Sequence, residues 1–163
     1  MAKRQKRVPV QRSSSIDGAV SDGLSEVQEL KQEMEDWASN MESSNMEHLP
    51  KYEEVNECKE TLEEHADSEP TIPDAFPEGL EDKVDWQEPM AKRAGHISRA
   101  LRLDQALAGV SAAKDHVQGF LDEHDDDDAC WTEDCERSEW ENYLSELETI
   151  VDGLEGVSFP GMY

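Results

Sequence analysis

Apolar residues recur with heptad spacing between positions 20 and 41, on an acidic background. Two positions of each heptad are apolar, which leaves one narrow stripe that needs a partner. Pro50 interrupts this pattern, which resumes at Tyr52, and a loop this short returns the second helix along the first. We therefore predict a helical hairpin or coiled coil over residues 21–66, with helices near 25–42 and 51–66. Its core or oligomer seam comprises Val27, Leu30, Met34, Trp37 and Met41.

Two more segments carry helical periodicity. Residues 91–121 have apolar positions three or four apart, and residues 136–154 repeat the pattern before two glycines that suit a helix end. Between the pairs, residues 67–90 hold four of the seven prolines and predict an acidic linker or strap, lying against the chain's own helices or in a partner's groove. The predicted fold is all-α: a hairpin and a second helical pair over 91–163, forming an irregular bundle with a disordered basic arm at 1–20.

Charge is distributed unevenly. The chain has 40 acidic residues against 15 Lys and Arg, a net charge of -25, and a hydrophobic content of only 36% predicts a thin core. Such an imbalance bears on partners and association rates rather than on the fold. The densest acidic run is a candidate surface for binding a partner, and it comprises Asp122, Glu123, Asp125, Asp126, Asp127 and Asp128.

Basic residues form two small groups that are candidates for contacting nucleic acid. One lies in the N-terminal arm and the other near the start of the predicted 91–121 helix. They comprise Lys3, Arg4, Lys6, Arg7, Lys92, Arg93 and Arg99. The arm is also explained as a solvated tail, or as a segment for targeting or for docking to an acidic surface. The second group is also explained by intramolecular neutralisation by the surrounding carboxylates.

A metal site is the first chemistry to test, because His124, Cys130 and Cys135 lie within twelve residues and thiolate plus imidazole binds zinc. The spacing disfavours it, since four residues separate the cysteines and a fourth ligand would have to be Cys58 or a carboxylate. A calcium loop starting at Asp122 places Asp127 where a sharp turn needs glycine. We expect no metal and no cofactor.

Enzyme signatures are missing from the sequence. It has no Gly-rich phosphate loop, no nucleophile elbow and no His-Glu-x-x-His, so we expect no catalysis. Three cysteines, an odd number, and a basic start without an apolar run favour a reducing, cytoplasmic location. No stretch approaches the roughly 20 apolar residues of a membrane helix.

Three short segments, at 29–42, 51–55 and 155–162, resemble short acidic coil-containing proteins of bacteriophages and mobile elements. This resemblance implies a phage-like origin, with the host-cell cytoplasm or the virion as the location. It implies no activity and no site residues.

These observations favour binding without catalysis. In the first hypothesis the acidic helices imitate the phosphate array of nucleic acid and inhibit a protein partner, such as a basic nucleic-acid-binding protein. In the alternative, the chain is a structural, assembly or virion-associated protein. Its coiled coil then oligomerises, and its basic arm contacts nucleic acid or an acidic neighbour.

Overall fold

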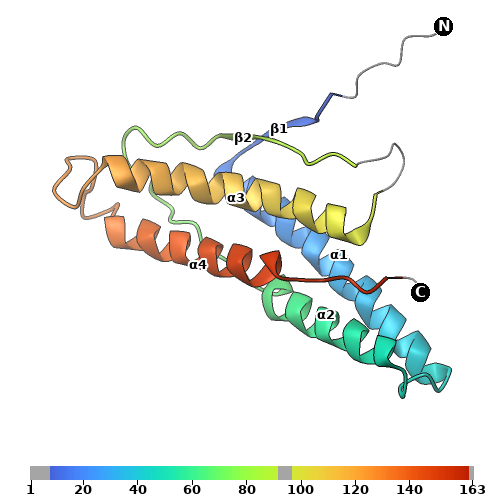
Figure 1. Cartoon of the computed structure of the whole chain (residues 1–163). Helices are drawn as coiled ribbons and strands as arrows, with labels where there is room; N and C mark the ends of the chain where they lie inside the picture. Colours follow the sequence, from blue (N-terminus) through green and yellow to red (C-terminus); the bar gives the residue numbers. More distant parts are fainter. Residues whose placement is uncertain (1–7, 92–96, 162–163) are drawn as a thin grey trace, which may run out of the picture.

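The computed structural model describes residues 8–91 and 97–161, and four helices dominate it (Figure 1). The longest helix, α1, packs against both α2 and α3, and α4 packs against α3 and α2. The predicted, mainly helical architecture is confirmed, with one small sheet added. In chain order the elements are β1 (Gln11–Ser14), α1 (Ile16–Ser43), α2 (Pro50–Ala66), β2 (Val84–Gln87), α3 (Arg99–Glu123) and α4 (Arg137–Glu155).

Helix α1 begins at Ile16, nine residues before the predicted start. The Ser15 side chain accepts a hydrogen bond from the Gly18 backbone N–H (3.0 Å), and Asp82 Oδ1 accepts one from the Ile16 N–H (2.9 Å). These bonds satisfy donors that a helix start leaves open. The prediction of a disordered arm is therefore wrong for residues 11–20, which form β1 and the first turn of α1. Its first seven residues lie outside the described range.

The predicted seam lies in the core of the chain itself. Val27, Leu30, Met34 and Met41 are all buried, while Trp37 is half-buried and packs at the edge of the core. The buried stripe of α1 also includes Ile16, Ala19, Val20, Gly23, Leu24 and Ala38. A stripe this wide contacts two helices at once, α2 and α3, instead of one coiled-coil partner. The seam thus offers no exposed face for a second copy.

Helix α3 begins at Arg99, eight residues after the predicted start, with Ser98 Oγ accepting a hydrogen bond from the Leu101 N–H (3.1 Å). Residues 92–96, which the prediction included in this helix, lie outside the described range. Helices α2 and α4 begin and end within one residue of their predicted bounds. None of the helices among the described residues is long and apolar enough to cross a membrane.

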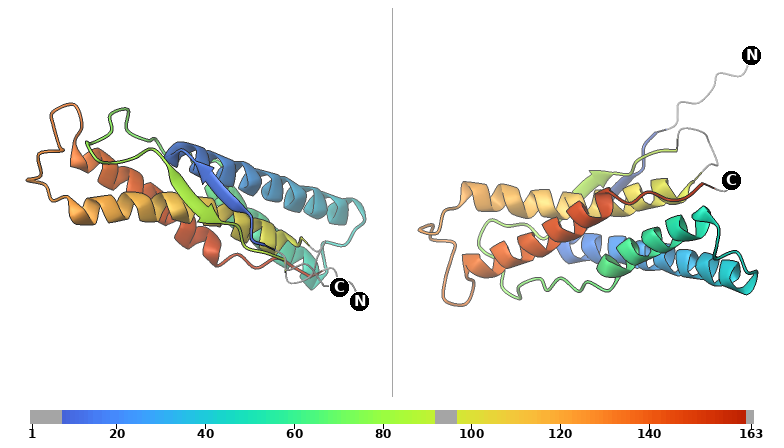
Figure 2. Two further views of the ribbon diagram at one scale, coloured as in Figure 1. Left: turned by 90° about the horizontal axis from the view of Figure 1, so that it is seen from above. Right: turned by 60° about the horizontal axis from the view of Figure 1, so that its bottom comes forward.

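The two strands form an antiparallel ribbon that lies over α3 and the start of α1 (Figure 2). Arg12 stands opposite Trp86 in the register, and Arg12 also pairs with Glu88. The Trp86 ring packs on Gly109 of α3, where an added Cβ would approach a ring carbon to 3.1 Å. The strap before β2 places Ile72, Ala75 and Leu80 against the core, so it packs on the chain's own helices.

Helices α1 and α3 approach each other closely at Gly23. A Cβ on this residue would lie 2.7 Å from the Ala106 carbonyl oxygen and 2.7 Å from a methyl group of Val110. Because the Ala106 oxygen is a backbone atom, it cannot move away from an added side chain unless the two helices separate. The absence of a side chain at this position therefore sets the distance between the two longest helices.

We expect Gly23→Ala to lower the free energy of unfolding by about 1 to 3 kcal/mol, because the added methyl group overpacks the α1–α3 contact. Gly119→Ala is the matched control, since a Cβ there meets nothing within 4 Å. In α3 this change should raise stability by about 0.5 to 1 kcal/mol through helix propensity. Urea unfolding of both variants measures the difference, and stabilisation by both would refute the close contact.

Candidate functional site

The loop between α3 and α4 is held firmly at both ends. Arg137, the first residue of α4, donates hydrogen bonds through Nη1 to the Leu121 carbonyl (2.9 Å) and to the His124 carbonyl. A cation at this position also suits the negative end of the α3 dipole. Within the loop the Trp131 indole N–H donates to the Asp125 carbonyl (3.0 Å), and Thr132 and Cys135 form an antiparallel bridge. The loop is thus fixed by its own contacts.

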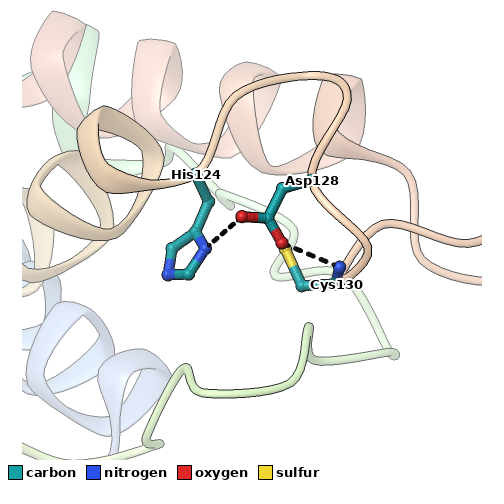
Figure 3. A group of neighbouring side chains, drawn as sticks. All are labelled: His124, Asp128 and Cys130. Atoms are coloured by element: carbon teal, nitrogen blue, oxygen red, sulfur yellow. Dashed lines mark hydrogen bonds and ion pairs between the residues drawn. The ribbon is translucent and has the colours of Figure 1, made fainter.

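Three side chains of different chemistry converge in this loop (Figure 3). His124 Nδ1 lies 2.9 Å from Asp128 Oδ2, and Asp128 Oδ1 accepts a hydrogen bond from the Cys130 backbone N–H (3.0 Å). The ligand atoms of His124, Asp128 and Cys130 all lie within 4.8 Å of one another. We call this group the loop triad.

The environment of the loop triad sets the proton affinities of its acids. The Cys130 N–H and the His124 ring bond to the Asp128 carboxylate and lower its pKa to about 2. Desolvation and the neighbouring Asp128 carboxylate raise the pKa of the Cys130 thiol to about 11. At neutral pH the chain therefore carries an ionised Asp128 beside a protonated Cys130.

Aromatic rings line one side of the loop triad. Phe120 stacks on the His124 ring with centroids 4.1 Å apart, and Trp131 meets Phe120 edge-on at 5.8 Å. The Arg137 guanidinium lies 6.0 Å from the Trp131 ring centre. This packing restricts the orientation of the His124 ring.

Cys135 lies apart from the loop triad. It is buried, and its Sγ donates a hydrogen bond to the Ala75 carbonyl in the strap (3.4 Å). The structure therefore joins His124 and Cys130 to Asp128, a residue that sequence reasoning considered only as part of the acidic run. The signal that identifies it is local: His124 and Asp128 are four residues apart at a helix end, and Asp128 and Cys130 are two apart in a turn.

The acids of the predicted acidic surface do not share one environment. Asp122, Glu123, Asp125, Asp126 and Asp127 are exposed, whereas Asp128 is half-buried against His124. Asp126 also pairs with Arg137 Nε at 3.1 Å. Part of the run is thus occupied within the chain, and the remaining carboxylates face solvent.

Two arginines at the start of α3 pair with glutamates of α1. Arg102 contacts Glu26 (2.6 Å) and Glu33 (2.5 Å), and Arg99 contacts Glu33 (3.3 Å). The Arg99 guanidinium also lies over the Trp37 ring, 5.4 Å from its centre. Intramolecular neutralisation is therefore confirmed for Arg99. The other predicted nucleic-acid contacts lie outside the described residues, namely Lys3, Arg4, Lys6, Arg7, Lys92 and Arg93.

A groove of about 570 Å³ lies between the ribbon, α1 and α3, and Trp86 forms part of its wall. Its volume is in the range of small-molecule sites. Its arginines, however, are paired with its own acids, Arg12 with Glu88 and Arg102 with Glu26. The arginines that line the groove are therefore already paired within the chain.

Helix α2 carries a row of exposed carboxylates that sequence reasoning did not single out. Steps of four, three and four residues place them within about 60° of arc over about 16 Å of helix. They lie opposite the buried face of α2, which contains Val55, Cys58 and Leu62. Within the described part of the chain, none of them pairs with Lys or Arg. This α2 stripe comprises Glu53, Glu57, Glu60 and Glu64.

Most of the acidic charge has no basic partner in the described residues. Six of the 15 Lys and Arg residues lie outside them, so nine remain against all 40 acids, a net charge of -31. Ion pairs between described residues engage eight of the 40 acids with Lys or Arg. The folded chain therefore presents a large, fixed excess of carboxylates.

Comparison with protein-family models, curated protein sequences and solved structures gives no match. The resemblance to acidic phage proteins thus stays a prediction.

Proposed function

We propose that this protein is non-enzymatic and acts by binding a basic nucleic-acid-binding protein, which it inhibits by occupying the nucleic-acid surface. The α2 stripe is the observation that carries the proposal. Its carboxylates are held in line on a helix whose opposite face is buried, so their spacing does not depend on flexible backbone. A preorganised charge array binds without the cost of ordering it first.

The charge spacing of the α2 stripe resembles that of a nucleic-acid strand. Four carboxylates over about 16 Å of helix give one charge per roughly 5 Å. One strand of duplex DNA carries a phosphate per roughly 3.4 Å of axis. The remaining unpaired acids extend the negative field and accelerate encounter with a basic cleft. The exposed acids of 122–127 belong to the same field.

The assembly alternative requires a seam that is free to oligomerise. Val27, Leu30, Met34 and Met41 are buried against the chain's own helices, which leaves the basic arm as the remaining support for that alternative. Arg99, which was to contribute to nucleic-acid contact, is engaged by Glu33. These contacts favour the inhibitory-binding proposal over assembly.

The proposal is tested by capture from an extract of the source cells, followed by displacement. The immobilised full chain should retain a basic nucleic-acid-binding protein, identified by mass spectrometry, and added duplex DNA should release it. Removing residues 1–7 should leave capture unchanged or increase it, because the arm opposes the acidic field. Capture that resists DNA and is lost with the arm would instead support assembly.

A further inference from the structure

The loop triad combines three kinds of metal ligand at one place. We propose that His124 Nδ1, a carboxylate oxygen of Asp128 and Cys130 Sγ bind a divalent transition-metal ion such as Zn²⁺. The three ligand atoms already lie within 4.8 Å of one another. This inference does not depend on the proposed binding function.

The set of ligands selects the class of metal. Thiolate and imidazole favour Zn²⁺ and Co²⁺, whereas Mg²⁺ and Ca²⁺ prefer oxygen. Ca²⁺ needs six to eight oxygen ligands, and the loop triad supplies one carboxylate. The neighbouring exposed acids Asp122, Asp125 and Asp127 raise the local concentration of any cation without choosing among them.

The distances fit a tetrahedral ion after small movements. With bonds of about 2.0 to 2.3 Å, ligand atoms around tetrahedral Zn²⁺ stand about 3.3 to 3.6 Å apart. His124 Nδ1 and Asp128 Oδ2 are 2.9 Å apart because a hydrogen bond joins them, so they need to separate by only about 0.4 Å. The widest pair, at no more than 4.8 Å, needs to close by about 1 Å.

Neighbouring residues hold the three ligands in place and still allow the small movements that metal binding requires. The Cys130 N–H bond to Asp128 Oδ1 fixes one carboxylate oxygen and leaves Oδ2 directed at His124. Phe120 stacks on the His124 ring and Arg137 anchors the His124 carbonyl. The Arg137 charge is balanced by Asp126 and Glu141, at 3.1 and 2.7 Å. The fourth coordination position is left to water or an external ligand.

Metal binding changes the protonation of Cys130 and His124. The Cys130 thiol loses its proton to solvent when the sulfur–metal bond forms. Neutral His124 offers the Nδ1 lone pair, and its single proton moves to Nε2. Asp128 Oδ2 loses its hydrogen bond from His124 and bonds to the metal ion instead. One proton is therefore released per ion bound when His124 is neutral, and affinity falls as the pH is lowered.

Co²⁺ titration of the reduced, full-length chain is the direct test. We expect one equivalent of Co²⁺ to produce a thiolate-to-cobalt charge-transfer absorption, which Zn²⁺ abolishes and excess Mg²⁺ does not. Cys130→Ser should remove the absorption, and His124→Gln should weaken binding at least tenfold. Cys58→Ser and Cys135→Ser are matched controls that should retain it. No charge-transfer absorption, or one that survives in Cys130→Ser, would overturn the proposal.

A second measurement uses the unaltered chain, so that misfolding of a variant cannot decide the result. Zn²⁺ should slow alkylation of Cys130 by iodoacetamide at least tenfold, as mapped by mass spectrometry. The rates at Cys58 and Cys135 should not change. Equal rates at Cys130 with and without Zn²⁺ would also overturn the proposal.

Discussion

Replacing Trp140 with alanine is expected to lower the free energy of unfolding by about 3 to 5 kcal/mol, enough to unfold much of a marginally stable chain. Trp140 is 1% exposed. Its ring meets Phe76 edge-on at 5.0 Å and Tyr143 at 6.0 Å, and its indole N–H donates to the Ala75 carbonyl (3.2 Å). The substitution removes the ring contact between α4 and Phe76 of the strap. It also removes one of the two hydrogen bonds that the Ala75 carbonyl accepts, the other coming from Cys135 Sγ.

Trp37→Ala is the matched comparison. Trp37 is half-buried at the edge of the core and carries Arg99 over its ring. Its loss should cost about 1 to 2 kcal/mol, from partial burial and a cation–π contact. Urea unfolding of the two variants gives the ranking. A larger loss for Trp37 than for Trp140 would mean that the stability of the chain centres on the predicted hairpin seam, and not on the packing of α4.

Much of the helical fold was predictable because apolar periodicity records which face is buried. Helices α2 and α4 begin and end within one residue of their predicted bounds. Pro50 marks where α2 begins, and the glycines near 153 mark where α4 ends. The start of α1 was missed because Gly18 and Gly23 look like interruptions. Both lie inside the helix, and Gly23 allows α3 to approach closely.

The small sheet could not be predicted from local pattern. β1 and β2 are four residues each and lie some 70 residues apart in sequence, so only tertiary contact joins them. The neutralisation of Arg102 by Glu26 and Glu33 has the same cause, because it depends on how α1 faces α3. The loop triad was not predicted, because the sequence analysis grouped His124 with Cys130 and Cys135 and did not single out Asp128 as their neighbour.

Removing the charge of the α2 stripe should have a large effect on binding to the captured partner. Changing all four of its glutamates to glutamine keeps their size and removes four negative charges. With roughly 0.5 to 1 kcal/mol per charge pair, affinity should fall about 30-fold or more. The matched control removes the same charge from exposed acids of the irregular strap. It consists of Glu69→Gln, Asp74→Asn, Glu78→Gln and Glu81→Gln.

Recognition through the α2 stripe is tested by the salt dependence of partner affinity, measured in parallel for the parent chain, the α2-stripe variant and the strap control. Raising salt from 0.1 M to 1 M shortens the Debye length from about 10 Å to about 3 Å. We predict that the parent chain and the strap control lose affinity steeply over this range. The α2-stripe variant should bind weakly at 0.1 M and change little. Equal affinity and equal salt dependence for all three would contradict recognition through an ordered row of carboxylates.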